Sequence, residues 1–284
     1  MSLKLMYITN RPEVAQIAES AGVDRIFIDL EYIGKAERQG GMDTVQNHHS
    51  VEDVRAIRKA IVSAELLVRV NPIHEATECY DSSKDEIDAV VRAGADIVML
   101  PYFKTAQEVE KFIELVDGRA RTMLLFETPE SIDNIDEILD LKGIDEVFIG
   151  LNDLSLGYGK KFMFELLADG TVERICLKFK QKGYPYGFGG IASLGKGMLP
   201  SEYVIREHYK LGSTCVILSR SFCNVNKINH IGVISATFVN GVREIRDFEL
   251  RCKHYADFFT ESEEEMHNMV HKIVDSLEMS SSAK

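Results

Sequence analysis

Nine consecutive residues, 93–101, read AGADIVMLP and decide the fold. The glycine can adopt the left-handed conformation that ends a helix, and the apolar residues 97–100 follow it as a short strand. Because these four residues are apolar without alternation, they predict a strand of a parallel sheet that is covered on both faces.

The same junction recurs along the chain, at residues 21–24 (AGVD), 142–145 (KGID) and 211–214 (LGST). Eight strands are expected, at residues 4–9, 25–30, 65–70, 96–101, 121–127, 146–151, 186–192 and 214–220. The intervening segments have apolar residues three and four positions apart, which predicts helices. Four of these helices are expected to begin at side chains that can cap them, Ser50, Thr105, Ser131 and Ser201.

Eight strand and helix units favour a single (β/α)8 TIM barrel over an open doubly wound sheet, which is the alternative. After residue 220 the pattern becomes helical, around residues 240–259 and 262–277. We therefore expect a barrel domain at residues 1–225 and a C-terminal helical extension at residues 226–284. The extension would pack on the barrel or on a neighbouring subunit.

Composition excludes several classes of partner. The 284 residues include 33 Lys+Arg and 45 Asp+Glu, a formal net charge of −12, and no clustered basic run. This argues against nucleic acid or an anionic membrane surface as a partner. No apolar run approaches the roughly 18 residues of a membrane span. The cysteines form no C-x-x-C pair, which fits reduced thiols and a cytoplasmic location.

Catalytic groups of such barrels come from the C-terminal ends of the strands. Several expected strands end in charged residues: Asp29 and Glu31, Arg69, Glu127, and Asp153. Each of these charges alone is equally well explained as a solvated group at the barrel mouth. Glu127 and Asp153, however, follow neighbouring strands, which lie about 5 Å apart in a sheet. Both carboxylates can therefore reach one divalent cation, and two carboxylates plus waters usually hold Mg²⁺.

The strand ends also occur as an ordered set of motifs. They read FIDLE (27–31), VRVN (68–71), MLPYFKTA (99–106), LFETPES (125–131) and FIGLNDLS (148–155). In this order they resemble the strand-end motifs of the HpcH/HpaI aldolase/citrate lyase family, from about residue 5 to residue 225.

The resemblance implies a phosphoenolpyruvate/pyruvate-type barrel that works as a class II, metal-dependent aldolase. The residues that match Glu127 and Asp153 would bind Mg²⁺ or Mn²⁺, and Arg69 would contact a small anionic 2-oxo acid of the pyruvate or oxaloacetate type. The cation would stabilise an enolate as a Lewis acid, with Arg69 beside the developing oxyanion. Backbone N–H groups at Asn152 and Asp153 would hold the substrate carboxylate. The resemblance also implies a homo-oligomer.

Two positions depart from the family pattern. The family's aldolases place a histidine after the glutamate of the second strand and pair it with an aspartate before the fourth strand. This chain has Tyr32 and Arg92 at these places, so the usual base dyad is absent. The chain also lacks the Gly/Arg-rich insertion of those aldolases after Pro101, which brings it nearer to the citrate lyase β-like branch.

A long segment, residues 32–50, follows the second strand without periodicity, which is more typical of a functional loop than of an inert one. We assign Glu31, Lys35 and Arg38 to substrate binding, with the two cations facing the anionic end of a second substrate. His49 is the candidate proton-transfer group, since histidine titrates near neutral pH. The alternative is a solvated loop with His49 near a helix start.

The leading hypothesis is a divalent-metal-dependent carbon–carbon lyase that cleaves or forms a 2-oxo acid through an enolpyruvate intermediate. Two alternatives stay open. One is a citrate-lyase-β-like lyase that acts on a CoA thioester, and the other is a non-catalytic barrel that binds a metal and a 2-oxo acid.

Overall fold

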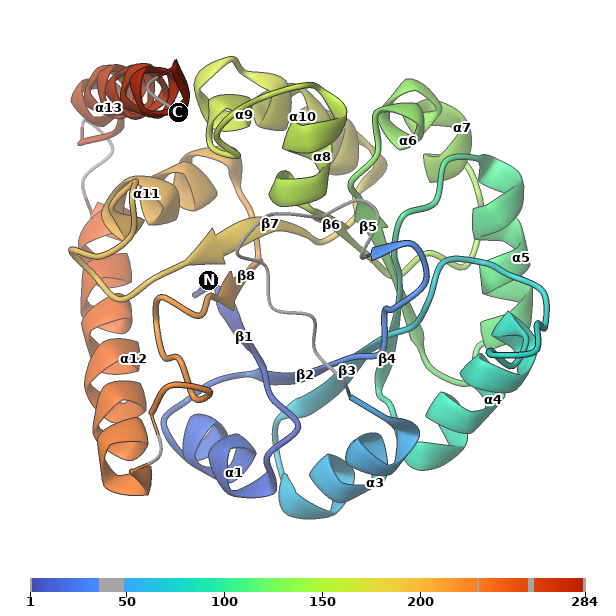
Figure 1. Cartoon of the computed structure of the whole chain (residues 1–284). Coiled ribbons are helices and arrows are strands. Elements are labelled where there is room, and N and C mark those ends of the chain that lie inside the picture. The colour runs from blue at the N-terminus through green and yellow to red at the C-terminus, as the bar shows by residue number, and fades with distance from the viewer. Residues whose placement is uncertain (1, 36–48, 229, 255–257, 283–284) are drawn as a thin grey trace. The chain divides into compact units, whose positions relative to one another are not determined.

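The eight expected strands form a closed parallel barrel in sequence order (Figure 1). The computed structural model describes residues 2–35, 49–228, 230–254 and 258–282. The strands are β1 Lys4–Ile8, β2 Arg25–Asp29, β3 Glu65–Arg69, β4 Ile97–Leu100, β5 Arg121–Phe126, β6 Glu146–Ile149, β7 Tyr186–Ile191 and β8 Cys215–Leu218. The predicted TIM barrel is thereby confirmed, and the open doubly wound sheet is excluded.

Helices follow the strands in the alternating order that the sequence predicts. They are α1 Pro12–Ser20, α3 Val51–Ala60, α4 Ser83–Ala93, α5 Ala106–Val116, α6 Pro129–Asp133, α7 Ile135–Leu139, α8 Leu151–Gly157, α9 Glu165–Ala168, α10 Thr171–Lys182, α11 Ser201–Leu211, α12 Ile231–His254 and α13 Phe258–Ser282. None of the described helices combines the length and the apolar composition that crossing a bilayer requires.

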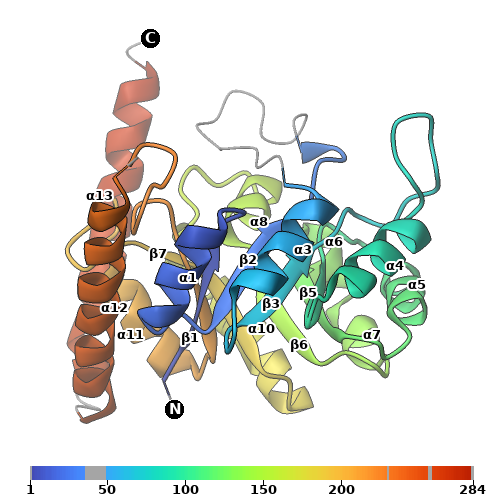
Figure 2. The same cartoon turned by 90° about the horizontal axis from the view of Figure 1, so that it is seen from below.

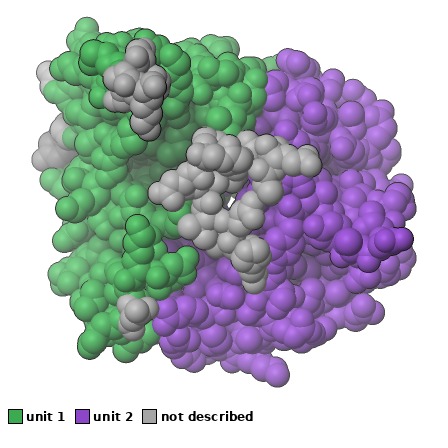
Figure 3. Space-filling model, viewed as in Figure 1, with its two compact units in different colours: residues 1–4, 149–284 green, residues 5–148 purple. Residues whose placement is uncertain are grey.

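Contacts divide the chain into two compact units, which Figure 3 distinguishes by colour. Unit 2, residues 5–148, contains β2 to β5 with α1, α3, α4 and α5, and each of these helices contacts the next one. Unit 1, residues 1–4 and 149–284, contains β7, β8 and the C-terminal helices. Whether residues 226–284 form a domain of their own stays a prediction.

The two C-terminal helices of unit 1 are longer than the sequence pattern predicts (Figure 2). Both α12 and α13 pack on α11, and α13 also contacts α9. The buried Glu249 of α12 accepts hydrogen bonds from the Leu3 amide at 2.7 Å and from the Tyr209 hydroxyl at 2.8 Å. These bonds hold α12 to the first residues of the chain and to α11.

The predicted junction glycines have the backbone conformation that ends a helix. Gly22, Gly94, Gly143 and Gly212 have φ of 97°, 101°, 94° and 77°. At these angles a side chain would be strained, so glycine is the natural residue there.

Two of the four predicted helix caps are confirmed. Ser50 and Thr105 each accept a hydrogen bond from the amide three residues later, and the carboxylates of Asp53 and Glu108 complete two capping boxes.

The predicted caps at Ser131 and Ser201 are wrong. Thr128 caps α6 instead, because Pro129 favours the first helical position and moves the helix start forward. Ser201 lies inside the first turn of α11, where its hydroxyl accepts a hydrogen bond from the Ala192 amide at 2.7 Å. The Ser201 hydroxyl therefore binds the residue after β7 and does not cap α11.

A buried ion-pair network lies at the N-terminal ends of β2, β3, β5 and β6. The Arg25 side chain is fully buried and binds Glu146 through two hydrogen bonds of 2.7 and 2.8 Å. Its Nε donates to Glu65 at 2.7 Å, and Arg121 also pairs with both carboxylates. Because the active sites of such barrels lie at the opposite end, this network serves stability.

We expect Arg25→Met to lower the free energy of unfolding by about 3–5 kcal/mol, because it leaves Glu146 buried with only part of its compensating charge. Urea unfolding at pH 7 measures the loss. Arg55→Met is the control, because Arg55 pairs with Glu52 on an exposed helix face and should cost less than about 1 kcal/mol. Equal losses in both variants would contradict a stabilising role for the network.

Candidate functional site

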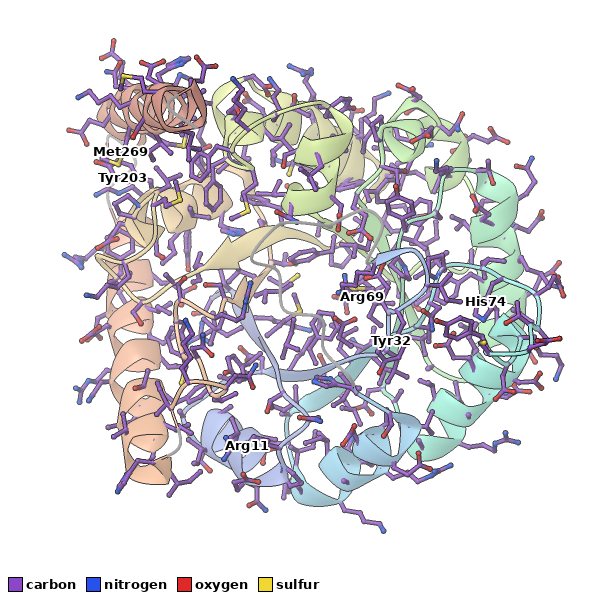
Figure 4. The ribbon with its side chains drawn as sticks, viewed as in Figure 1. Arg11, Tyr32, Arg69, His74, Tyr203 and Met269 are labelled. Atoms are coloured by element: carbon purple, nitrogen blue, oxygen red, sulfur yellow. The ribbon has the colours of Figure 1, made fainter. Side chains whose placement is uncertain are left out.

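The register between β2 and β3 places Asp29 directly opposite Arg69. Directly opposite residues of paired strands point to the same side of the sheet and touch. Nε and Nη2 of Arg69 donate to the two oxygens of Asp29 at 2.8 and 2.9 Å, a bidentate pair. The C-terminal ends of two neighbouring strands are thus joined by an ion pair in which Asp29 is buried and Arg69, labelled in Figure 4, is 13% exposed.

Two further charges complete a cluster with this pair. Nη1 of Arg69 lies 3.2 Å from the Glu31 carboxylate. The Lys35 ammonium lies 2.9 Å from Asp29 and 3.3 Å from Glu31. The strand-end cluster, defined as Asp29, Glu31, Lys35 and Arg69, therefore pairs two cations with two carboxylates. It balances its own charge in a place that excludes most water.

The cluster favours the charged forms of Asp29 and Arg69. Burial would raise the pKa of Asp29, but Arg69 and Lys35 overcome this effect and hold that pKa well below its ordinary value. Burial likewise opposes the charge of Arg69, but Asp29, Glu31 and, more weakly, Glu127 raise the pKa of the guanidinium well above its ordinary value. Glu127 therefore lies within the electrostatic reach of Arg69.

Asn71, two residues after Arg69, fixes the beginning of the long segment after β2. Its side-chain oxygen accepts hydrogen bonds from the amides of Tyr32 and Ile33 at 2.8 and 2.9 Å. Its side-chain nitrogen donates to the Leu30 carbonyl and to Glu86 of α4. The direction in which the chain leaves β2 is thus set from the end of β3.

His49, at the other end of the long segment, also contacts the end of β2. Its Nδ1 accepts a hydrogen bond from the Asp29 amide at 3.1 Å, and its backbone carbonyl accepts one from the Tyr32 hydroxyl. The bond to Nδ1 assigns the proton of the neutral ring to Nε2. To take up a proton at Nδ1, His49 would have to release the Asp29 amide.

Tyr32, which the resemblance matches to a histidine, is labelled in Figure 4. Burial, together with Asp29, Asp53 and Glu86, raises the pKa of its hydroxyl to about 12. At neutral pH Tyr32 is therefore a hydrogen-bond donor and not a base. Arg92 is exposed in the last turn of α4, before β4 begins, and so lies away from the C-terminal strand ends.

Glu127 directly follows β5, and its side chain is buried. One of its oxygens accepts a hydrogen bond from the Tyr102 amide at 3.0 Å. Asn152 and Asp153 lie in the first turn of α8, which follows β6 and belongs to unit 1. The pairing of Glu127 with Asp153 stays a prediction.

The structure brings Glu31, Lys35 and Arg69 together, places His49 at the Asp29 amide, and leaves Arg38 outside the described residues. The roles assigned to these residues stay predictions. Sequence reasoning gave no role to Asp29, to Asn71 or to the Tyr102 amide. The sequence does place Asp29 at the end of β2, as it places Arg69 at the end of β3. Predicting that the two side chains meet also requires the register between these strands.

The end of β5 offers one carboxylate that suits a small divalent cation. Among the described residues, no group of three or more His, Cys, Asp or Glu side chains could hold a metal. Mg²⁺ usually needs only one or two carboxylates, since waters and substrate oxygens complete its shell. The buried Glu127, with one oxygen fixed by an amide, is a suitable hard ligand.

We expect Asp29→Asn to lower the free energy of unfolding at pH 7 by about 3 kcal/mol or more, because it leaves two buried cations with one carboxylate. The folded-state pKa of Asp29 is depressed, so its contribution is complete above its unfolded pKa of about 3.9 and is lost as the pH falls below it. The difference from wild type should stay constant from pH 8 to 5. Below about pH 4 it should shrink by up to roughly 1.4 kcal/mol per pH unit.

Urea unfolding between pH 8 and pH 3 measures this profile. The control is Asp133→Asn, at an exposed position of α6, which should change stability by less than about 0.5 kcal/mol at every pH. A penalty for Asp29→Asn that persists unchanged to pH 3 would show that the charge of Asp29 is not what stabilises the cluster.

Part of the chain is similar to characterised aldolases. It is 25% identical over 177 residues to the 2-keto-3-deoxy-L-rhamnonate aldolase of Escherichia coli (strain K12). The match covers 51% of this chain and 58% of that protein, so the chain spans less than two thirds of the relative's length.

Solved structures share the fold at low sequence identity. An HpcH/HpaI aldolase/citrate lyase family protein from Burkholderia cenocepacia J2315 superposes with a TM-score of 0.59 at 16% identity, over 86% of this chain and 94% of that one. The citrate synthase SbnG gives a TM-score of 0.59 at 16% identity, over 83% of this chain and 92% of that one. The family model for HpcH/HpaI aldolase/citrate lyase matches residues 4–181, more than half of the chain. The chain therefore belongs to the HpcH/HpaI aldolase/citrate lyase family.

Proposed function

We propose that the protein is a divalent-metal-dependent carbon–carbon lyase that cleaves or forms a 2-oxo acid of the pyruvate or oxaloacetate type. The observation that supports this proposal best is the buried Glu127 carboxylate at the end of β5, within the electrostatic reach of Arg69. A hard anionic ligand beside a permanent cation suits a substrate that must be bound through oxygen atoms and stabilised as an enolate.

Glu127 and Asp153 are the proposed ligands of Mg²⁺ or Mn²⁺. When bound, such a cation supplies Lewis acidity to the carboxylate and keto oxygen of a pyruvate unit. The backbone N–H groups at Asn152 and Asp153, in the first turn of α8, are the proposed donors to the substrate carboxylate.

Arg69 is the proposed stabiliser of the enolate oxygen. A guanidinium has five N–H groups, and three nitrogen atoms of Arg69 each face a carboxylate of the strand-end cluster. We assign the second N–H of each terminal nitrogen to the substrate. Held in this way by Asp29 and Glu31, the guanidinium needs little reorientation when negative charge develops.

Lys35 and Arg38 are proposed to face the anionic end of the second substrate. Lys35 brings a second cation to the cluster, although Asp29 and Glu31 compensate its charge in the described conformation. Glu31 would then set which of the two cations is available to a ligand.

In cleavage, a base removes the hydroxyl proton of the carbon bonded to C3 of the pyruvate unit, and that carbon leaves as a carbonyl group. The electron pair of the broken bond forms the C2=C3 double bond, and the π pair of the keto group moves to the enolate oxygen. A proton is then added at C3 to give the 2-oxo acid. We propose His49 for proton transfer, with release of the Asp29 amide when the ring is protonated.

Proton exchange at the methyl group of pyruvate tests the proposal. With Mg²⁺ or Mn²⁺ in deuterated water, we expect the protein to exchange these protons and to decarboxylate oxaloacetate, as followed by NMR. Glu127→Gln or Asp153→Asn should lower both rates at least about 100-fold, the scale on which loss of a positioned charge acts in catalysis.

The control for this assay is Glu137→Gln, at an exposed position of α7, which should leave both rates unchanged. If pyruvate binds but neither reaction occurs with either metal, the lyase proposal fails and the non-catalytic barrel is favoured.

A pair of substitutions separates proton transfer by His49 from its structural contact. In His49→Asn the side-chain oxygen can still accept the Asp29 amide but cannot carry a proton, whereas His49→Ala loses both functions. We expect both variants to lose about 100-fold or more in pyruvate exchange, the usual contribution of a general acid or base. Activity retained in His49→Asn and lost in His49→Ala would reduce His49 to a structural contact.

A further inference from the structure

The chain adopts an uncommon backbone conformation at Tyr102, immediately after β4 and Pro101. Its φ is 48°, in the left-handed region where side chains are strained. Among the described residues other than glycine, only Tyr102 and Asp117 have positive φ. Asp117 ends a helix, where this conformation is common, but Tyr102 lies at the C-terminal end of a barrel strand. Strain at such a place indicates a function when the surrounding contacts impose it.

Contacts of the two residues after Tyr102 hold the chain that leaves the turn. Phe103 is buried and packs edge to face on Phe126 of β5, with ring centroids 5.0 Å apart. The Thr128 hydroxyl donates to the Phe103 carbonyl at 2.8 Å. The Asn134 side chain donates to the Lys104 carbonyl at 3.0 Å. Phe103 and Lys104 are therefore held to β5 and to the residues that follow it.

The Tyr102 amide lies at the start of this left-handed turn. Its N–H donates to Oε1 of Glu127 at 3.0 Å. The peptide plane between Pro101 and Tyr102 sets the direction of this N–H, and the positive φ turns the chain that follows it. The bond restrains the rotation of a carboxylate that is also buried.

We propose that the Tyr102 backbone N–H is a positioning group that presets the Glu127 carboxylate for a divalent cation. This inference rests on the proposed function, in which Glu127 is a metal ligand. Hydrogen bonds to metal-ligating carboxylates orient them, and their loss typically lowers metal affinity by about 10-fold to 100-fold. Because the donor is a backbone amide, the identity of the side chain at position 102 matters only through the conformation it permits.

Backbone chemistry tests this role directly. Replacing Tyr102 by its α-hydroxy acid analogue, 4-hydroxyphenyllactic acid, turns the amide into an ester and removes only the N–H. We expect the Kd for Mn²⁺, measured on the full chain by calorimetry and by electron paramagnetic resonance, to rise about 10-fold or more. Tyr102→Gly keeps the N–H and favours positive φ, so its Kd should stay within about 3-fold of wild type.

A matched control is the same ester substitution at Lys104, whose amide donates to Glu108 at 2.8 Å. It removes a similar bond to a carboxylate, and the Kd for Mn²⁺ should not change. Tyr102→Gly should also have a higher Tm than Tyr102→Ala, because only glycine relieves the positive φ. Circular dichroism establishes that each variant is folded.

The outcomes separate this inference from the function on which it rests. If wild type binds Mn²⁺ with a site that Glu127→Gln removes, but the Tyr102 ester binds equally well, the positioning role is overturned and the metal site stands. If wild type binds no Mn²⁺, or if Glu127→Gln binds it unchanged, both are overturned. A lower affinity in the Lys104 ester of the same size would also overturn the specific role of Tyr102.

Discussion

The buried pair of Asp29 and Arg69 is the interaction on which the strand-end site depends. Strand register places the two side chains opposite each other, and two parallel hydrogen bonds join them. Neither charge would be tolerated alone at this depth, because an unpaired buried ion costs several kcal/mol. Lys35 and Glu31 extend the pair, since each lies close to a group of opposite formal charge.

The local balance of charge differs from that of the whole chain. The formal net charge of −12 repels an anionic ligand at long range, and the strand-end cluster contributes no net charge to offset it. Attraction must then act over short distances, through Arg69 and through any cation held by Glu127. Salt screens the unfavourable long-range field more than it weakens such buried contacts.

The sequence predicted the strands well because their signals are local: a helix-ending glycine followed by an apolar run. The caps at Ser131 and Ser201 were wrong because their hydroxyl groups lie inside helices whose starts are set by neighbouring residues. Position at a strand end was enough to select Arg69 and Glu127. The ion pair of Arg69 with Asp29 depends on the register between β2 and β3. The hydrogen bond from the Tyr102 amide to Glu127 lies at a backbone turn with positive φ. Neither feature can be predicted from the composition of one segment.

The imidazole near the end of β2 comes from His49, at the far end of the long segment. Tyr32 stays protonated at neutral pH and donates to the backbone of His49, whose ring then reaches the Asp29 amide. The Tyr32 hydroxyl thus helps to position His49 rather than carrying a proton itself. Because Asp29 contacts Arg69 and Lys35 through its side chain and His49 through its backbone, a change at any of these residues reaches the others. Asp29 therefore links His49 to Arg69 and Lys35. Protonation of His49 would break its hydrogen bond to the Asp29 amide and would add a positive charge near Arg69.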